Sequence, residues 1–404
     1  MPTVPTGGEL KNLTFVGLFA GIGGFELGFK TAGFRPILMC EIDENARRVL
    51  DTRFPEVKLH SDIRDLPKLP KVDVLCAGFP CQDLSAAGKT AGIEGSHSGL
   101  IWEVFRLLKR GPKPSWVVFE NVPFMLQLNG GKAIKVITEE LAELGFSWAY
   151  RVVDARSFGI PQRRRRVILI ASRSGNARRV LLGDEAPLGD QQDNGACGFF
   201  WTEGNTGLGW ARNAIPTLKS GSGLGIPSPP GIWLKGKGIF TPSIMDAERL
   251  QGFPANWTAC VDPSKARFRW RLVGNALTVP IAEWLARRIL QPGPYDHRTD
   301  TRIDVHTGGW PYAAWGNAAN VFRSNASEWP VSRKWTPLSE FLEHEMSPLS
   351  FNATAGFLKR ARASRLKFEP GFLEDVAKHV EAMGQNSHAT KRTNPSKAFV
   401  PASQ

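Results

Sequence analysis

Short apolar runs alternate with amphipathic stretches over residues 13–172. The apolar runs have the length and β-rich composition of buried strands: LTFVGLF, RPILMCEI, VDVLCAGF, PSWVVFEN, WAYRVVDA and RVILIAS. Between them lie segments whose apolar residues recur at helical spacing: FELGFKTAG, DENARRVLDTRF, LIWEVFRLLKR and AIKVITEELAELG. Buried strands separated by helices of this length predict a parallel sheet with both faces covered, an open α/β sandwich.

The alternation stops near residue 172. Residues 174–240 are rich in Gly, Pro, Ser, Asn and Trp and show little periodicity, which predicts a loop-rich insert carried by the sheet. Helical spacing returns in TVPIAEWLARRIL. Residues 292–404 are expected to form a C-terminal extension with Trp-rich segments, short helices and a flexible polar tail from about residue 385.

The charge of the chain suits a polyanionic partner. Its 51 Lys and Arg against 38 Asp and Glu give a net charge of +13, which favours nucleic acid first, although basic proteins without such a partner are common. Five widely spaced cysteines without a CxxC pair, and seven histidines, predict neither a disulfide framework nor a metal site. No stretch approaches the apolar length of a membrane span, so a cytoplasmic protein is expected.

A glycine-rich turn follows the first predicted strand. In LFAGIGGFELGF, Gly21 and Gly23 let the backbone bend tightly and approach a ligand at a helix N-terminus. A dinucleotide fingerprint would need glycine where Glu26 stands, so the turn alone is weak. Glu41 ends the next strand about 20 residues on, where a carboxylate can bind ribose hydroxyls. Together the glycine turn and Glu41 favour a site for a nucleoside cofactor over a tight turn that binds no ligand. Asp62, in the loop SDIRDL, fits either a contact to adenine or a helix cap.

Two chemically useful side chains follow the next two strands. Cys81 stands in GFPCQDLS, directly after a strand, and the carboxyl ends of parallel strands are where such sheets bind ligands. A thiol near a helix N-terminus or arginines can ionise and act as a nucleophile, whereas the alternative is a buried structural cysteine. Glu120 ends PSWVVFEN at the same edge, where a partly desolvated carboxyl could donate a proton, or simply form a salt bridge.

Four consecutive arginines, 163–166, enter the last apolar run. Strand alternation sends Arg164 and Arg166 to one side, which we expect to be the ligand cleft. A solvated charged face is the other interpretation, and contacts to phosphates would also suit such a run.

Taken together, these blocks resemble the DNA cytosine-5 methyltransferase family. They occur in the family's order over roughly 280 residues: FAGIGG, Glu41, GFPCQDLS, ENV, QRRRRV as Gln-x-Arg-x-Arg, RLQGFP and VGNAL. The resemblance implies an α/β Rossmann-like methyltransferase fold, a doubly wound sheet with a small, loop-rich target recognition domain and a C-terminal extension. The implied division is a catalytic, cofactor-binding domain at 13–172, the recognition domain at 173–265, a returning segment at 266–291 that completes the catalytic domain, and the extension at 292–404.

The resemblance also implies the chemistry. Family enzymes flip the target cytosine out of the helix. Cys81 would attack C6 of that base, Glu120 would protonate N3, and Arg166 and Arg164 would hold O2. The cofactor would be S-adenosylmethionine, without a metal.

Cofactor and DNA contacts follow from the same resemblance. The implied cofactor-binding residues are Phe19, Gly21, Gly23, Glu41, Ile42, Asp62, Ile63, Pro80, Leu100, Asn275 and Ala276, and the implied DNA-binding residues are Gln82, Ser85, Arg163 and Arg165. The implied partner is double-stranded DNA, with a cognate restriction endonuclease acting independently. We therefore expect a monomeric, nucleoid-associated enzyme of the prokaryotic or phage restriction-modification type.

Two alternatives stay open beside this interpretation. A catalytically idle DNA-binding regulator would be expected to have damaged catalytic blocks, and Cys81, Glu120 and the arginine pair are intact. An RNA cytosine-5 methyltransferase of the transfer-RNA type would carry a Cys-Phe-Thr tripeptide in the insert, which has none.

Overall fold

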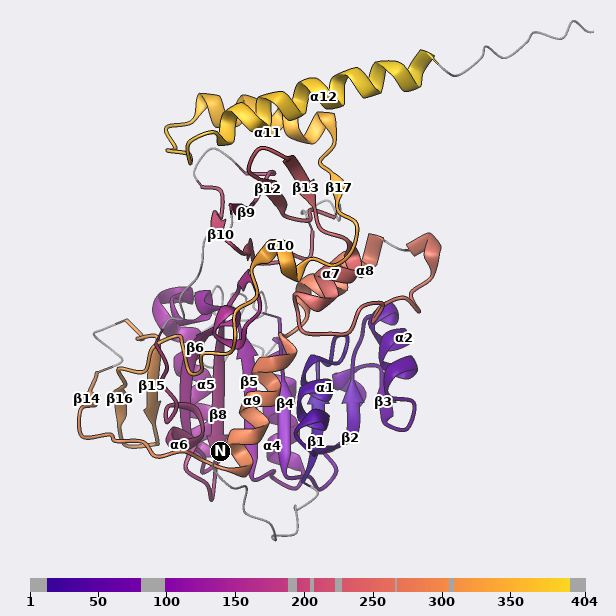
Figure 1. Ribbon diagram of the computed structural model, residues 1–404. Helices are drawn as coiled ribbons and strands as arrows, with labels where there is room; N and C mark the ends of the chain where they lie inside the picture. The colour runs from indigo at the N-terminus through magenta and orange to yellow at the C-terminus, as the bar shows by residue number, and fades with distance from the viewer. Residues whose placement is uncertain are drawn as a thin grey trace, which may run out of the picture.

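A ten-stranded sheet forms the body of the molecule in the computed structural model (Figure 1), which describes residues 13–80, 99–187, 195–203, 207–221, 227–265, 267–304 and 309–392. The strand order is β14-β16-β15-β6-β8-β5-β4-β1-β2-β3. The strands are β1 (Thr14–Leu18), β2 (Arg35–Cys40), β3 (Lys58–His60), β4 (Val74–Ala77), β5 (Trp116–Asn121), β6 (Ser147–Asp154), β8 (Arg165–Ser172), β14 (Thr301–Arg302), β15 (Ala313–Gly316) and β16 (Val321–Arg323). Strands β1 to β5 pair in parallel, as the apolar runs predict.

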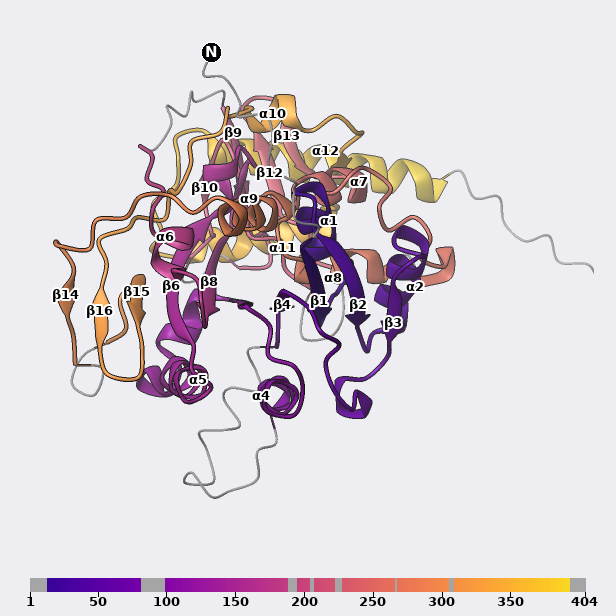
Figure 2. The ribbon, with the colours of Figure 1, turned by 90° about the horizontal axis from the view of Figure 1, so that it is seen from below.

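Helices cover both faces of this sheet, which makes it doubly wound (Figure 2). Helices α4 (Leu100–Arg110) and α5 (Lys132–Glu143) bury their apolar sides on one face. Helices α1 (Gly24–Thr31), α6 (Ala177–Leu181) and α9 (Val279–Leu290) do so on the other. A further helix, α2 (Glu44–Arg53), is capped by Asp43, whose side chain accepts hydrogen bonds from two backbone N–H groups of its first turn.

Strands β6 and β8 differ from the all-parallel expectation. They form an antiparallel hairpin, and β8 also lies antiparallel to β5. The connection between them is short and contains only the 3₁₀ turn Ala155–Phe158 and the two-residue strand β7 (Gln162–Arg163). A parallel arrangement needs a crossover of a dozen or more residues, usually a helix, so this connection can close only a hairpin.

The insert forms most of a second, small sheet, although the sequence predicted mainly loops. The small sheet has the order β10-β9-β12-β13-β17 and is antiparallel. Its strands are β9 (Ala196–Phe199), β10 (Ala211–Arg212), β12 (Gly231–Leu234), β13 (Gly238–Thr241) and β17 (Ser347–Pro348). Strand β11 (Ile215–Pro216) pairs instead with β7 and links the insert to the main sheet. Strands of two to four residues are too short to produce a readable alternation.

The described part of the C-terminal extension, residues 292–304 and 309–392, contributes strands to both sheets. Strands β14 to β16 extend the main sheet beyond β6, whereas β17 belongs to the small sheet. Helices α11 (Phe351–Ala363) and α12 (Phe372–Arg392) pack on the small sheet at the top of Figure 1. Helix α12 continues to Arg392, past the point near residue 385 where the sequence predicted a flexible tail.

Three short helices connect these parts. Helices α7 (Ile244–Arg249) and α8 (Arg267–Asn275) follow the small sheet, and α10 (Leu338–Phe341) leads back to it. Helix α8 returns the chain to the main sheet, and α9 then packs along α1.

Candidate active site

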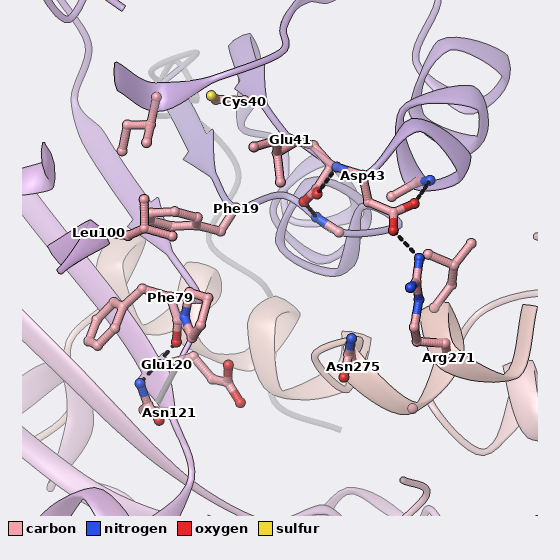
Figure 3. A pocket seen from close by; sticks show the side chains of 18 of the residues that line it. Phe19, Cys40, Glu41, Asp43, Phe79, Leu100, Glu120, Asn121, Arg271 and Asn275 are labelled. Carbon is pink, nitrogen blue, oxygen red and sulfur yellow. Dashed lines mark hydrogen bonds and ion pairs between the residues drawn. The ribbon is translucent and has the colours of Figure 1, made fainter. Parts of the chain in front are cut away.

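A cavity of about 370 Å³ opens at the carboxyl ends of β1, β2, β4 and β5 (Figure 3). Helix α8 closes it from the other side with Arg271, Leu272, Gly274 and Asn275. Twelve of the predicted site residues line it: Phe19, Gly21, Glu41, Ile42, Asp62, Ile63, Pro80, Leu100, Glu120, Arg164, Arg166 and Asn275. The structure therefore brings together residues that lie far apart in the sequence.

Glu41 is fixed at the end of β2 by two backbone groups. Its Oε2 accepts a hydrogen bond from the Gly21 N–H at 2.7 Å, and its Oε1 accepts one from the Asp43 N–H at 2.8 Å. Burial raises the pKa of Glu41, and these N–H donors oppose that rise. Because each carboxylate oxygen has a second lone pair, both can still accept hydrogen bonds from a ligand.

The glycine turn supplies two pocket residues, Phe19 and Gly21, and one packing residue, Gly23. Phe19 has a φ of 56°, which is uncommon for a non-glycine residue, and its ring lies beside Leu100 on one wall of the cavity. At Gly21, also left-handed, an added Cβ would meet nothing within 4 Å. At Gly23 it would lie 2.6 Å from the Phe54 ring, so this glycine permits helix packing and does not line the cavity.

Asp62 lies in the cavity wall but is already engaged. Its carboxylate caps the 3₁₀ turn Ile63–Asp65 and forms a two-pronged ion pair with Arg64. The hydrogen bonds from the Arg64 side chain lower the pKa of Asp62 to about 2, so the carboxylate is ionised. Both the pocket location and the helix cap considered for this residue are present.

Glu120 and Arg166 form an ion pair on the floor of the cavity. The Arg166 Nε donates to the Glu120 Oε1 at 2.9 Å, and both side chains are largely buried. A Cβ on Gly78 would lie 3.3 Å from the other oxygen, Oε2, so Glu120 also faces the backbone that leads to Cys81. Burial lowers the pKa of Arg166, while the Glu120 charge and hydrogen bond favour its charged form.

Arg164 enters the same cavity wall, but its guanidinium holds backbone segments together. It donates to the carbonyls of Leu218 at 3.2 Å, Gly274 at 3.2 Å and Ala276 at 2.6 Å. Arg164 thus joins the insert and the returning helix to the end of the main sheet. Ala276 contributes this carbonyl and does not itself line the cavity.

The outward-facing arginines have different surroundings. Arg163 is exposed and donates to the Trp210 carbonyl. Arg165 forms an ion pair with Glu328 and lies over the Tyr312 ring. Because these C-terminal side chains occupy the Arg165 guanidinium, a contact to DNA would require breaking that pair, which the resemblance alone could not reveal.

Asn121 holds the segment that precedes Cys81. Its side-chain amide donates to the Phe79 carbonyl at 3.1 Å, and its side-chain oxygen accepts from the Val122 N–H. Pro80 therefore reaches the cavity rim from a fixed position. Cys81, Gln82 and Ser85 themselves lie outside the described residues.

Several site residues escaped the sequence analysis. Arg271 of α8 forms an ion pair with Asp43 across the cavity mouth (Figure 3). Gln162, the first residue of the Gln-x-Arg-x-Arg block, donates to the Leu250 carbonyl at 2.7 Å and accepts from the Leu218 N–H at 2.9 Å. The position of Gln162 in that block could have identified it from the sequence as a site residue. No sequence pattern indicates that Arg271 pairs with Asp43.

The described part of the chain holds neither a metal-binding cluster nor a membrane-spanning helix. Within those ranges, no group of three or more His, Cys, Asp or Glu side chains is arranged to hold a metal ion. Among the same residues, no helix has both the length and the apolar character needed to cross a membrane.

Known proteins give this site its context. The family model for C-5 cytosine-specific DNA methylases matches residues 13–193. The type II methyltransferase M2.BsuMI of Bacillus subtilis strain 168 is 43% identical over 377 residues, covering 89% of this chain and 96% of that protein. The type II methyltransferase M.Bsp6I of Bacillus sp. strain RFL6 is 30% identical over 314 residues, which cover 69% of this chain and 98% of that protein. The solved structure of the S. pombe Dnmt2 methyltransferase has a TM-score of 0.51 at 14% identity, covers 69% of this chain and 98% of that one, and supports the fold alone. The chain belongs to the C-5 cytosine-specific DNA methylases and is a DNA cytosine-5 methyltransferase.

Proposed function

We propose that this enzyme transfers a methyl group from S-adenosylmethionine to C5 of a cytosine flipped out of a specific double-stranded DNA sequence. The observation that carries the proposal is the Glu120–Arg166 pair, which shares one cavity with Glu41 and Pro80. A carboxyl and a guanidinium side by side match the N3 and O2 edge of a cytosine. The base must leave the stack because C5 is inaccessible there.

Cys81 acts as the nucleophile in this proposal. Its thiolate attacks C6 of the cytosine, and Glu120 donates a proton to N3, so the electron pair displaced from the 5,6 double bond is held as an enamine. Arg166 donates to O2 and keeps Glu120 oriented. After C5 has gained the methyl group, its proton passes to solvent, the freed electron pair re-forms the 5,6 double bond as the Cys81–C6 bond breaks, and N3 returns its proton to Glu120, which restores the free thiolate.

Arg164 has a positioning role in this scheme. Its guanidinium donates to three backbone carbonyls, which sets the wall of the cavity opposite Glu120. Arg166, whose guanidinium reaches Glu120, is the better candidate for contact with the base.

The residues of the cavity fit the cofactor. The Glu41 carboxylate can accept from both ribose hydroxyls, while Phe19, Leu100 and Ile63 offer an apolar surface for the adenine. Ile42, Asp62 and Asn275 complete the rim. When bound, S-adenosylmethionine supplies an electrophilic methyl group on a sulfonium. The cofactor assignment rests on this fit and on the family.

DNA is proposed to bind between the main sheet and the small sheet. The small sheet, with the segments packed on it, is called the recognition domain below. The net charge of +13 favours a polyanion, and Arg163 is exposed beside the insert. Gln82 and Ser85, next to Cys81, would approach the duplex. The relatives named as type II methyltransferases suggest a restriction-modification role on DNA in the cytoplasm, with a separate endonuclease and a monomeric methyltransferase.

Bisulfite sequencing tests the chemistry. DNA from cells that express the intact chain should contain conversion-resistant cytosines in one fixed short context. The Cys81→Ser variant should lose them, because a serine hydroxyl is a far weaker nucleophile toward C6, and a loss of at least 10³-fold in transfer rate is expected as an order-of-magnitude estimate.

A matched substitution separates chemistry from folding. Cys260 is a partly exposed cysteine outside the cavity, and Cys260→Ser should leave methylation intact. If the Cys81→Ser variant methylated DNA as well as the intact chain, the catalytic proposal would be wrong. If neither the intact chain nor Cys260→Ser methylated DNA, a catalytically idle DNA-binding protein would be the better description.

A further inference from the structure

We infer that the C-terminal segment 347–392 is the second half of the recognition domain, and that Arg360 is a positioning residue for its loop 200–203. This inference rests on the proposed function, because it assigns a role in DNA recognition. The loop 200–203 directly follows β9 of the small sheet.

The recognition domain has one core, built from two distant parts of the chain. Phe199 of β9 lies 5.0 Å from Phe357 and 5.1 Å from Phe372, measured between ring centroids. Trp210 and Trp233 lie 5.0 Å and 5.3 Å from the same Phe372 ring. Without α11 and α12, these aromatic side chains would be exposed to water, so the insert cannot bury its core alone.

Polar contacts fix the position of the helices on the sheet. The Asp375 carboxylate accepts from the Trp233 Nε1 at 2.9 Å and from the Gly236 N–H at 2.8 Å. Hydrogen bonds from these donors lower the pKa of Asp375, so it is ionised when it binds the turn between β12 and β13. Glu369 forms an ion pair with Arg212 of β10. The helices are therefore anchored at defined points of the small sheet.

Arg360 connects α11 to the loop 200–203. Its Nη2 donates to the Trp201 carbonyl at 2.7 Å, and its Nε donates to the Glu203 carbonyl at 3.1 Å. Hydrogen bonds from a planar guanidinium fix the orientation of both peptide groups. The Trp201 Nε1 in turn donates to the Pro229 carbonyl, which holds the other side of the turn.

The loop continues this connection to the active site. Glu203 forms an ion pair with Lys219, whose Nζ also lies 3.6 Å from the centroid of the Phe200 ring. The backbone of Lys219 packs so closely on Gly274 that an added Cβ there would lie 2.4 Å from it. Gly274 lines the cavity, and its carbonyl accepts from Arg164.

Because Glu203 pairs with Lys219 and Lys219 packs on Gly274 at the cavity, the shape of the loop 200–203 should affect how DNA is held beside Glu120. Arg360 sets the shape of this loop without touching the cavity itself. Removing Arg360 should thus weaken recognition of DNA and leave the cofactor pocket and the chemical step nearly unchanged.

Steady-state kinetics of the full chain test the inference. Methyl transfer from tritiated S-adenosylmethionine to an unmethylated plasmid is measured at varied DNA concentrations for the wild type, Arg360→Met, Arg360→Lys and Arg362→Met. Arg362 is exposed on the same helix and carries the same charge, so it is the matched control. Bisulfite sequencing of the plasmid reports which contexts are methylated.

Arg360→Met should raise the KM for DNA roughly tenfold, since two charge-assisted hydrogen bonds are lost, with kcat and cofactor Kd within about twofold. Methylation should spread to contexts that differ by one base. Arg360→Lys should recover part of the KM, and Arg362→Met should match the wild type. A wild-type KM in Arg360→Met would overturn the inference, as would equal losses in kcat and cofactor binding.

Folding failure is read separately. Thermal unfolding of each variant shows whether Arg360→Met is folded. If it is not, Arg360→Lys becomes the test: a KM for DNA and a methylated sequence context equal to those of the wild type would contradict the inference. An inactive wild type would instead refute the proposed function.

Discussion

Glu26 is a buried carboxyl in the interior of the catalytic domain. It lies on α1 against Gly17, where an added Cβ would meet its Oε1 at 1.8 Å. Neither carboxyl oxygen has a hydrogen-bond partner among the described residues. Burial raises the pKa of Glu26 to about 8 from an ordinary value of 4.5. The neutral acid is therefore the form that the folded protein tolerates at neutral pH.

Glu26 should make stability fall as pH rises. Between pH 4.5 and about 8 the folded state holds a proton that the unfolded chain has released, so the free energy of unfolding decreases across this window. The fall should be on the order of a few kcal/mol. In Glu26→Gln this decrease should disappear, whereas Glu143→Gln, at an exposed position, should keep it. Urea unfolding at pH 5, about 7 and about 9 measures the slope; equal slopes in all three proteins would contradict the assignment.

Helices α1 and α9 pack closely against each other at Gly28 of α1. An added Cβ on Gly28 would lie 2.5 Å from the Ala282 Cβ and 2.7 Å from the Glu283 backbone nitrogen. Gly28→Ala would gain roughly 1 kcal/mol of helix propensity. The clash is with backbone that cannot move aside, so overpacking should win, and we expect a net loss of about 1–3 kcal/mol in the free energy of unfolding.

Denaturant unfolding checks this prediction, with Thr31→Ala on the exposed end of α1 as the control. A Gly28→Ala variant more stable than the wild type would mean that the two helices can separate without cost. The same variant should weaken cofactor binding, because α9 continues directly from the segment that carries Asn275.

The long elements could be predicted from the sequence, and the short ones could not. Helix α4 buries Ile101, Val104, Phe105 and Leu108 at helical spacing, and its bounds match the expected stretch. The two-residue strands β10 and β11 have no period to detect, and they form only because β9 and β7 offer partners. For the site, the ends of parallel strands predicted the meeting of Glu41 and Glu120. The contacts of Arg164 with carbonyls of distant loops depend on the folded backbone, which no spacing reveals.

At the scale of the whole molecule, the cavity is closed by segments from opposite ends of the catalytic domain. Asp43, which caps α2, pairs with Arg271 of α8 across the cavity mouth. Arg271 also lies 4.9 Å from the Phe268 ring centroid, which keeps its guanidinium in place. The pair therefore acts as a clasp between the first half of the sheet and the returning segment.

Breaking this clasp should weaken cofactor binding modestly. Because both side chains are partly exposed, a coupling of about 0.5–1 kcal/mol is expected, or roughly a two- to fivefold rise in the cofactor Kd for Arg271→Ala. A double-mutant cycle with Asp43→Asn, followed by calorimetry, measures the coupling. The coupling should shrink at high salt. Full additivity of the two substitutions would show that the ion pair does not act on the pocket.

The packing of α1 against α9 has a consequence for biosynthesis. The glycine face of α1 leaves the ribosome early, but Ala282, its packing partner, is made much later. At about 5–20 residues per second, roughly 250 intervening residues take on the order of 10–50 s to synthesise. Throughout that time the first helix lacks its neighbour, and the wall of the pocket formed by α8 does not yet exist. A nascent chain therefore has no complete pocket until the segment that carries α8 and α9 has been synthesised.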